Sequence, residues 1–319
     1  MTTKSAEKYV IFDTDMGVDD GWALQMILKA EKYLEHIKVL AITLVNGNTT
    51  VENSIKNAYR ILDGLDRTDI PIYKGATEAL IPCELKVGTF HGANGFGDYE
   101  FWHPDIYPSD PNTLTQQKHA VEIIRDLILS HPQKVTLVCL GPLTNVALAA
   151  KIYPEIKEKL GELYIMGGNF KGIGNETSCA EFNFYMDPEA AHIVLDTFKC
   201  PITILPWEAC RPDSIHISLE WSFATFANLE CKNIQLLHKI RRNPSHFSAC
   251  DAFLVAAFLF SEVCVREKQQ YHVTVELHGF NTRGQMILDH KRRKDANVTI
   301  IEALNEDEVK KAFQLAVKP

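Results

Sequence analysis

Residues 9–20 read YVIFDTDMGVDD, in which four apolar residues pass directly into a segment with four aspartates. The apolar run predicts a buried strand over residues 9–12, and the pattern after it predicts a helix over residues 21–30. Similar β-branched runs alternate with helical patterns along the chain. This alternation predicts an α/β fold with a doubly wound, mainly parallel central sheet and helices on both faces.

The other predicted elements repeat these two patterns. The strands are expected at residues 39–45, 70–73, 135–140, 163–166 and 202–205, and the helices at residues 51–62, 117–129 and 144–150. From residue 271 to 289 the pattern changes to a β-hairpin, with its turn at residues 281–284. Since no long Pro/Gly/Ser linker divides the chain, residues 1–319 are expected to form one domain.

The composition excludes several classes of protein. With 33 Lys+Arg against 41 Asp+Glu, the formal net charge is −8, so no basic surface is expected for nucleic acid. The longest apolar run, residues 252–260, is far shorter than the roughly 20 residues that cross a bilayer. The N-terminus has no apolar signal core, and the eight cysteines form no CxxC pair. We therefore expect a cytoplasmic protein with reduced thiols that binds neither nucleic acid nor a membrane.

Polar and glycine-rich residues follow several of the predicted strands. They occupy residues 13–20, 46–48, 141–145 and 167–169. Ligands of an open parallel sheet bind beyond the carboxyl ends of its strands. These segments are therefore expected to form one site.

The four aspartates of residues 13–20 require a counter-charge, because like charges this close raise one another's pKa. A hard cation with oxygen ligands, either Ca²⁺ or Mg²⁺, is the simplest candidate. The alternative is that Asp19 and Asp20 cap the following helix. Capping alone leaves Asp13 and Asp15 unexplained, so a metal site is favoured.

Three known motifs can be compared with this segment. An EF-hand loop counted from Asp13 would need Gly and Glu where the chain has Val18 and Leu24, and no Walker motif occurs. A haloacid-dehalogenase-like phosphatase also begins with strand–Asp-x-Asp, which would make Asp13 the nucleophile and Asp15 the acid/base. That pattern has Thr or Val where this chain has Gly17, and it remains the alternative function.

The string DTDMGVDD at residues 13–20 resembles the signature of the inosine–uridine-preferring nucleoside hydrolase family. Further strings resemble that family's segments in the family's order: AITLVNGN at 41–48, HGANGFG at 91–97, LGPLTN at 140–145, MGG at 166–168, GNETSCAEFN at 174–183, Asp251, and TRGQ at 282–285. Each string alone is weak evidence. Their order along most of the chain makes the resemblance specific.

The resemblance implies a Ca²⁺-dependent N-ribohydrolase of nucleoside salvage, which converts a ribonucleoside and water to ribose and a free base. It also implies a homodimer or homotetramer. The implied Ca²⁺ ligands are Asp15, Asp20, the backbone carbonyl of Leu140, and Asp251. Asp15 would take the proton from a metal-bound water as this water attacks C1′.

The resemblance also implies how the ribose is held. The implied contacts are Asp19, Asn48, Asn183 and Asp251 for the 2′ and 3′ hydroxyls, with Asn175 and Glu181 for the 5′ hydroxyl. Met166 is expected at the boundary between sugar and base. The alternative for Asn48 and Asn175 is that each is an ordinary turn residue beside a glycine.

The acid that protonates the leaving base is the point where the sequence departs from the family. Its inosine–uridine enzymes carry a histidine before the late metal-binding aspartate, and this chain carries Cys250 there. A purine-specific branch of the family carries tryptophan at this position and another branch carries cysteine, and this chain resembles the branch with cysteine. A thiol is a weak hydrogen-bond donor, so Cys250 is either the acid or a packing residue. His91, in the loop that resembles the family's base-contacting loop, and His238 and His246 are rival donors. A catalytically silent nucleoside-binding protein is therefore a further alternative, and base specificity stays open.

Two other features complete the predicted site. The aromatic loop with Trp102, His103 and Tyr107 is expected to cover the base. Trp207 and Glu208, directly after the strand predicted at residues 202–205, also differ from the commoner family pattern.

Overall fold

The computed structural model describes residues 8–82, 90–100, 102, 106–227, 229–241 and 243–318. A nine-stranded sheet lies at its centre, in the order β4-β3-β2-β1-β5-β6-β7-β11-β8. Its strands are β1 Lys8–Thr14, β2 Ile37–Leu44, β3 Ile72–Lys74, β4 Thr115–Gln116, β5 Val135–Cys139, β6 Glu162–Met166, β7 Ile202–Leu205, β8 Val265–Tyr271 and β11 Val298–Leu304. Neighbouring strands are parallel except for β8 against β11. The predicted mainly parallel sheet is confirmed.

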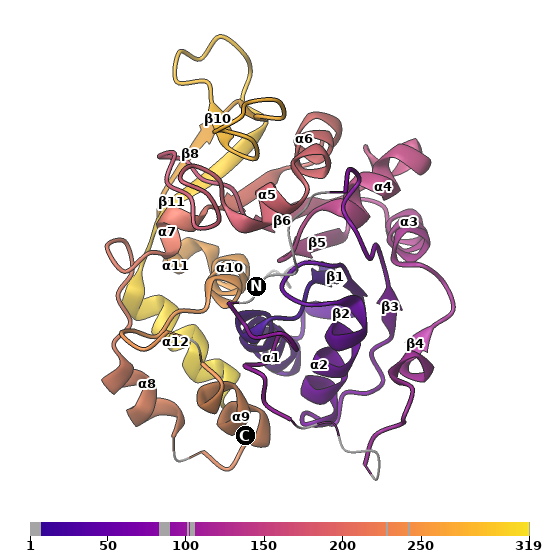
Figure 1. Cartoon of the computed structure of the whole chain (residues 1–319), viewed down its shortest axis with the longest axis vertical. Helices are drawn as coiled ribbons and strands as arrows, with labels where there is room; N and C mark the ends of the chain where they lie inside the picture. The colour runs from indigo at the N-terminus through magenta and orange to yellow at the C-terminus, as the bar shows by residue number, and fades with distance from the viewer. Residues whose placement is uncertain are drawn as a thin grey trace, which may run out of the picture.

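Helices cover both faces of this sheet, as Figure 1 shows. The helices are α1 Val18–Tyr33, α2 Val51–Asp63, α3 Ala120–Ser130, α4 Thr144–Ile152, α5 Phe182–Met186, α6 Pro188–Thr197, α7 Trp207–Cys210, α8 Leu219–Phe226, α9 Lys232–Lys239, α10 Cys250–Leu259, α11 Ser261–Cys264 and α12 Glu306–Ala316. Helices α1, α2, α10 and α12 pack in one apolar core. Helices α3, α4 and α6 pack in a second core on the opposite face. The two predicted helical layers are therefore present.

The strand β1 explains why its sequence is apolar without alternation. Val10 and Phe12 belong to one core, whereas Ile11 between them belongs to the other. Both faces of the strand are thus covered, as expected for the middle of a parallel sheet. The strand therefore ends, with its aspartates, at the centre of the sheet's carboxyl edge.

Three predicted boundaries need correction. Helix α1 begins at Val18 rather than Gly21, because the Asp20 carboxylate accepts a hydrogen bond from the Gly17 N–H and closes the first turn earlier. Helix α3 begins at Ala120 rather than residue 117, where the His119 ring accepts a hydrogen bond from the Val121 N–H. The predicted hairpin is present, but its paired strands are only β9 Val273–Val275 and β10 Met286–Leu288.

The seven described cysteines are free, and Cys83 lies outside the described residues. Among the described residues, no helix combines the length and apolar character needed to span a bilayer.

Candidate active site

Two turns, one after β1 and one after β2, bring Asp15 and Asn48 together. The Asn48 N–H donates to Asp15 Oδ2 at 2.6 Å, and Asn48 Nδ2 donates to Asp15 Oδ1 at 3.0 Å. The same Nδ2 lies 3.2 Å from Asp20 Oδ2, so the amide bridges two carboxylates. A Cβ at Gly47 would lie 2.1 Å from Asp15 Oδ2, so this approach requires glycine. Asn48 is therefore more than a turn residue.

Asp20 has two roles at the start of α1. Its carboxylate accepts hydrogen bonds from the Gly17 N–H at 2.8 Å and from the Thr14 hydroxyl. It also belongs to a group with Asp19 and Asp251, in which one ligand atom of each residue lies within 4.8 Å of the others. Capping and cluster formation are thus combined in one side chain.

The aspartates of this group come from distant parts of the sequence. Asp251 lies in the first turn of α10, and α10 packs against α1, which carries Asp19 and Asp20. Burial, followed by repulsion from Asp19, Asp20 and Asp15, holds the pKa of Asp251 well above its ordinary value. Burial and repulsion from Asp20 do the same for the pKa of Asp15. The pKa of Asp20 is also raised, mainly by burial and then by Asp19.

This arrangement has the donor chemistry of a hard-cation site. Three carboxylates supply oxygen atoms and lie close together, with Asp20 and Asp251 buried and Asp19 partly exposed. Within the described residues, the buried Asp19 Oδ1 accepts no well-aligned hydrogen bond, although His91 Nε2 lies 3.3 Å away. A divalent cation would match both features. This group contains Asp19, which the family resemblance places at the ribose, and not Asp15, which the resemblance places at the metal.

The Leu140 carbonyl lies at the end of β5 and is contacted by Asn183. Asn183 Nδ2 donates to the Leu140 carbonyl at 2.7 Å and to the Met166 carbonyl at 3.1 Å. A carbonyl oxygen has two lone pairs, so a cation and Asn183 can share the Leu140 oxygen. The first turn of α5 thus joins the ends of β5 and β6.

Glu181 fixes that turn and the loop before it. Its buried carboxylate accepts hydrogen bonds from the N–H groups of Asn183 at 2.9 Å, Phe184 at 3.1 Å and Gly168 at 2.8 Å. Burial raises the pKa of Glu181 to about 7. In the same loop, Asn175 Oδ1 accepts a hydrogen bond from the Phe182 N–H at 2.8 Å. This hydrogen bond does not use the Asn175 NH₂ group.

Asp13 lies inside the sheet and is held by its neighbours. Its Oδ1 accepts hydrogen bonds from the Thr43 hydroxyl at 2.6 Å and from Asn145 Nδ2 at 2.9 Å. Burial raises its pKa to about 7. This carboxylate connects β1, β2 and the first turn of α4, a position that disfavours the phosphatase alternative with Asp13 as nucleophile.

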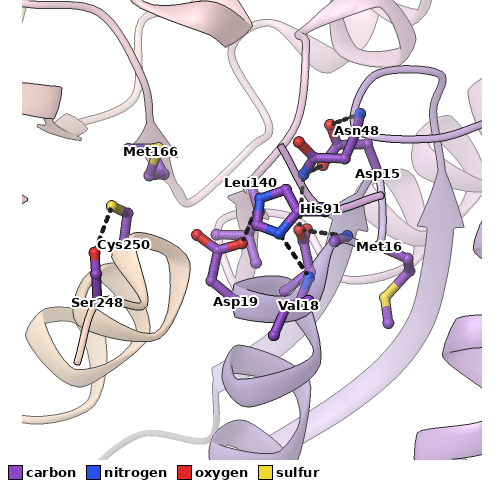
Figure 2. A network of polar contacts seen from close by, with 12 residues as sticks. Asp15, Met16, Val18, Asp19, Asn48, His91, Leu140, Met166, Ser248 and Cys250 are labelled. Carbon is purple, nitrogen blue, oxygen red and sulfur yellow. Dashed lines mark hydrogen bonds and ion pairs between the residues drawn. The ribbon is translucent and has the colours of Figure 1, made fainter. Parts of the chain in front are cut away.

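His91 lies over the start of α1. Its Nδ1 accepts a hydrogen bond from the Val18 N–H at 3.2 Å, so the neutral ring carries its proton on Nε2. That nitrogen faces Asp19 Oδ1 at 3.3 Å. Figure 2 shows His91 and Asp19 between Asp15 and Asn48 on one side and Cys250 and Met166 on the other.

Cys250 lies in the first turn of α10, directly before Asp251. Its Sγ is 3.9 Å from the Ser248 hydroxyl, as Figure 2 shows, and its side chain is buried. A hydrogen bond with Cys210, followed by burial, raises the pKa of the Cys250 thiol well above its ordinary value. The thiol is therefore neutral and only weakly polar.

The rival donors have other contacts. His246 contacts Asn243, Ser245 and His216. His238 packs against Phe223 and Phe226. Burial lowers the pKa of both imidazoles. Of the predicted donors, His91 and Cys250 have their contacts around the carboxylate cluster.

The aromatic loop packs on α2. The Trp102 and Tyr107 rings stack at 4.4 Å, and both lie edge-on to Tyr59 of α2. The Tyr107 hydroxyl also donates to Asp63 at 3.3 Å. These contacts attach the loop to α2, and His103 lies outside the described residues.

Two residues of the site region were missed or left without a role. Asn57 Nδ2 donates to the carbonyls of Met16 and Asn94 at 2.9 Å each, which ties the aspartate turn to the loop of His91. A buried asparagine inside a helix was the available sequence signal. Glu208 accepts hydrogen bonds from backbone N–H groups of the loop after β6. Backbone donors leave no trace in a sequence.

Comparison with known proteins gives consistent matches. The family model described as inosine-uridine preferring nucleoside hydrolase matches residues 10–311. The chain is 40% identical over 190 residues to the inosine-uridine preferring nucleoside hydrolase of Crithidia fasciculata, covering 59% of this chain and 57% of that protein. It is 32% identical over 293 residues to the pyrimidine-specific ribonucleoside hydrolase RihA of Salmonella arizonae, covering 88% of each.

Solved structures agree in fold over nearly the whole chain. A structure titled inosine-guanosine nucleoside hydrolase superposes with a TM-score of 0.86 at 30% identity, covering 98% of this chain and 99% of the other. A purine-preferring ribonucleoside hydrolase from Gardnerella vaginalis gives 0.84 at 24% identity, covering 97% and 98%, and supports the fold alone.

Proposed function

The chain belongs to the inosine-uridine preferring nucleoside hydrolase family, and we propose that it is an N-ribohydrolase that splits ribonucleosides into ribose and a free base. The observation that carries this proposal is the position of Asp251. Although it lies more than 200 residues from the aspartates of α1, it joins their buried cluster. Asn48 contacts Asp15, which follows β1, and Asn183 contacts the carbonyl of Leu140, which follows β5.

The proposed cofactor is Ca²⁺, held by Asp15, Asp20, Asp251 and the Leu140 carbonyl. Carboxylate and carbonyl oxygens in an irregular arrangement suit Ca²⁺ better than the strict octahedron of Mg²⁺. When bound, the cation offsets the charge of these carboxylates and lowers the pKa of a nearby water. Asp19 lies within the same group, so its carboxylate serves both this cluster and the ribose.

Asp15 acts as the general base. Both of its oxygens accept hydrogen bonds from Asn48, which fix the carboxylate at the end of β1. A base must lie within hydrogen-bond reach of the proton that it removes. Asp15 therefore takes the proton from the water that attacks C1′ of the ribose.

The ribose is held by polar groups that surround the cluster. Asp19, Asn48, Asn183 and Asp251 bind the 2′ and 3′ hydroxyls, whereas Asn175 and Glu181 bind the 5′ hydroxyl. His91 lies beside Asp19, with its Nε2 at 3.3 Å from Asp19 Oδ1. A substrate without the 2′ hydroxyl would leave buried polar groups unpaired, which disfavours deoxyribonucleosides.

The base leaves toward Met166 and Cys250. These side chains lie on the same side of Asp19 in Figure 2. Because the thiol is neutral and weakly polar, the pocket supports packing against the base more than its protonation. The family's inosine–uridine enzymes use histidine at this position, so base preference is the property most open to change here.

Two features of organisation belong to the same proposal. The chain acts as one domain, because strands from its N-terminal and C-terminal parts lie in one sheet. A homodimer or homotetramer stays a prediction from the family resemblance.

The proposal is tested by incubating the purified protein with a panel of ribonucleosides and measuring base release by chromatography. Release in Ca²⁺ that EGTA stops and excess Ca²⁺ restores is the expected result. Ca²⁺ alone should also raise the Tm, and Asp20→Asn should abolish that increase while Asp289→Asn keeps it. Ribonucleoside binding without base release would instead favour a catalytically silent binding protein. Phosphate release from a phosphorylated substrate would favour the phosphatase.

A further inference from the structure

Glu208 is a buried carboxylate directly after β7, in the short helix α7. Only 2% of its surface is exposed. Its Oε2 accepts a hydrogen bond from the Phe170 N–H at 2.9 Å, and its Oε1 accepts from the N–H groups of Lys171 at 2.8 Å and Ile173 at 3.1 Å. One carboxylate thus binds three backbone donors of a segment some 35 residues earlier in the chain.

This segment belongs to the loop between β6 and α5, which has no regular secondary structure from Gly167 to Glu181. Gly168 and Gly172 have φ values of +70° and +74°, in the left-handed region that glycine adopts without steric cost, so the loop turns at these two residues. The inner end of the loop is held by Glu181, through the Gly168 N–H. The next part, residues 170–173, is held by Glu208.

Asn175 follows this part of the loop by two residues. Its Oδ1 accepts from the Phe182 N–H, at the start of α5. The loop therefore reaches Asn175 from a segment held by Glu208 and returns to Glu181. Both proposed ligands of the 5′ hydroxyl depend on the same loop.

We propose that Glu208 is a positioning residue for substrate recognition, which holds residues 170–173 so that Asn175 reaches the 5′ hydroxyl of the ribonucleoside. This inference rests on the proposed function. The charge of Glu208 also contributes to the raised pKa of Glu181, after burial, so the two carboxylates lie in one electrostatic environment. Glu208 touches the loop backbone, and its effect on substrate passes through Asn175.

The variant Glu208→Gln keeps the size of the side chain and changes its hydrogen bonding. An amide has one acceptor oxygen and one NH₂ donor, so the NH₂ group would face at least one backbone N–H. The unpaired donors would loosen residues 170–173 without opening a cavity. A matched control is Asp289→Asn, since Asp289 accepts from three backbone N–H groups, those of Lys291, Arg293 and Lys294, in a loop outside the site.

The test compares a ribonucleoside with its 5′-deoxy analogue, which lacks the hydroxyl that Asn175 would bind. For the wild type, the 5′ hydroxyl should lower KM. Glu208→Gln should raise KM for the ribonucleoside by roughly three- to tenfold, the value of one hydrogen bond, and change KM for the analogue much less. Asp289→Asn should leave both KM values unchanged. Equal losses on both substrates, or no loss on either, would overturn the inference.

A second measurement separates this inference from the proposed function. Amide hydrogen exchange of the N–H groups of Phe170, Lys171 and Ile173 should be faster in Glu208→Gln than in the wild type. Unchanged exchange would overturn the inference even if the enzyme is active. If the wild type releases base from no ribonucleoside, the proposed function fails, while the exchange experiment still decides whether Glu208 holds this loop.

Discussion

Two sets of acidic residues in this protein have different neighbours. One set is the aspartates at the end of β1 and the starts of α1 and α10, and the other is Glu181 and Glu208, which contact the loop after β6. Glu181 and Glu208 are buried, and each accepts hydrogen bonds from three backbone N–H groups. Asp15, Asp20 and Asp251 are also buried, whereas Asp19 is partly exposed. Asp19, Asp20 and Asp251 lie close to one another, and Asn48 bridges Asp15 and Asp20. The buried carboxylates of the two regions therefore have different neighbours, which are backbone N–H groups for the glutamates and other carboxylates for the aspartates.

This difference separates positioning from chemistry. A buried carboxylate with a full set of donors is stable as it stands, and changing it alters the loop that supplies the donors. A buried carboxylate beside other carboxylates needs a cation or a proton. The aspartate cluster is thus the part of the molecule that requires a cation or a proton. The glutamates hold the loop after β6, and Glu181 also binds the 5′ hydroxyl in the proposed reaction.

The sharpest way to break this comparison is Asp15→Asn. If the cluster performs the chemistry, the loss of its general base should lower kcat by about 10²–10⁴-fold, since an amide cannot take a proton from water. Base release from the preferred ribonucleoside measures this effect, and the Tm in the presence of EGTA checks the fold without any contribution from bound Ca²⁺. The decrease in kcat/KM should exceed that of Glu208→Gln by at least an order of magnitude. Equal decreases in kcat/KM in the two variants would contradict the distinction between the two regions.

Asp13 sharpens the comparison, because its carboxylate accepts hydrogen bonds from Thr43 and Asn145 and, unlike Asp15 and Asp20, its raised pKa has no contribution from a neighbouring carboxylate. Its pKa is about 7 in the folded protein and 3.8 ordinarily. The folded state thus binds the proton more tightly, so the contribution of Asp13 to stability falls as pH rises from about 4 to about 7 and is constant above. The variant Asp13→Asn, which does not titrate, should flatten this part of the stability profile.

Urea unfolding at pH 5 and pH 8, with EGTA present to remove cations, measures that change. Between pH 5 and pH 8, the free energy of unfolding should fall by a few kcal/mol more in the wild type than in Asp13→Asn, at about 1.4 kcal/mol per pKa unit. The kcat for base release should stay within about tenfold of the wild type, since Asp13 contacts neither the water nor the ribose in the proposed reaction. A kcat loss as large as that of Asp15→Asn would instead give Asp13 a role in the chemistry of base release.

The sequence predicts the fold where its signal is local. The strand at residues 202–205 agrees with β7, because an apolar run between turn residues is diagnostic by itself. The strand β8, with the sequence VREKQQY, was missed because an exposed edge strand has no apolar periodicity. β11 was missed for another reason: it pairs with β7 and β8, and that pairing across the chain is decided by the whole fold.

The site divides in the same way. The segment at residues 13–20 carries its own signal, so Asp15, Asp19 and Asp20 could be singled out without a structure. Asp251 lies in an apolar helix with no local motif, and only the family resemblance included it. Glu208 binds backbone donors, which every residue except proline possesses, so no side-chain pattern could have assigned its role.

The smallest effect is expected for Cys250, which borders the cluster. Its thiol contacts Cys210 and Ser248 and has a raised pKa, so it stays neutral and donates a proton poorly. Cys250→Ala should therefore lower kcat by less than about tenfold, in contrast to the 10²–10⁴-fold expected for loss of a general acid. Cys264→Ala is the control, because Cys264 is buried beside α12 and a matching loss there measures packing alone.

The pH dependence of kcat decides between the two roles of Cys250. If the thiol only packs against the base, the pH profile of Cys250→Ala should have the same shape as that of the wild type. A general acid would instead contribute the alkaline limb of the wild-type profile, and the variant would lose that limb together with most of its activity. In that case the chemistry would extend from the aspartates to the first turn of α10, and the base would leave with a proton from sulfur rather than from solvent.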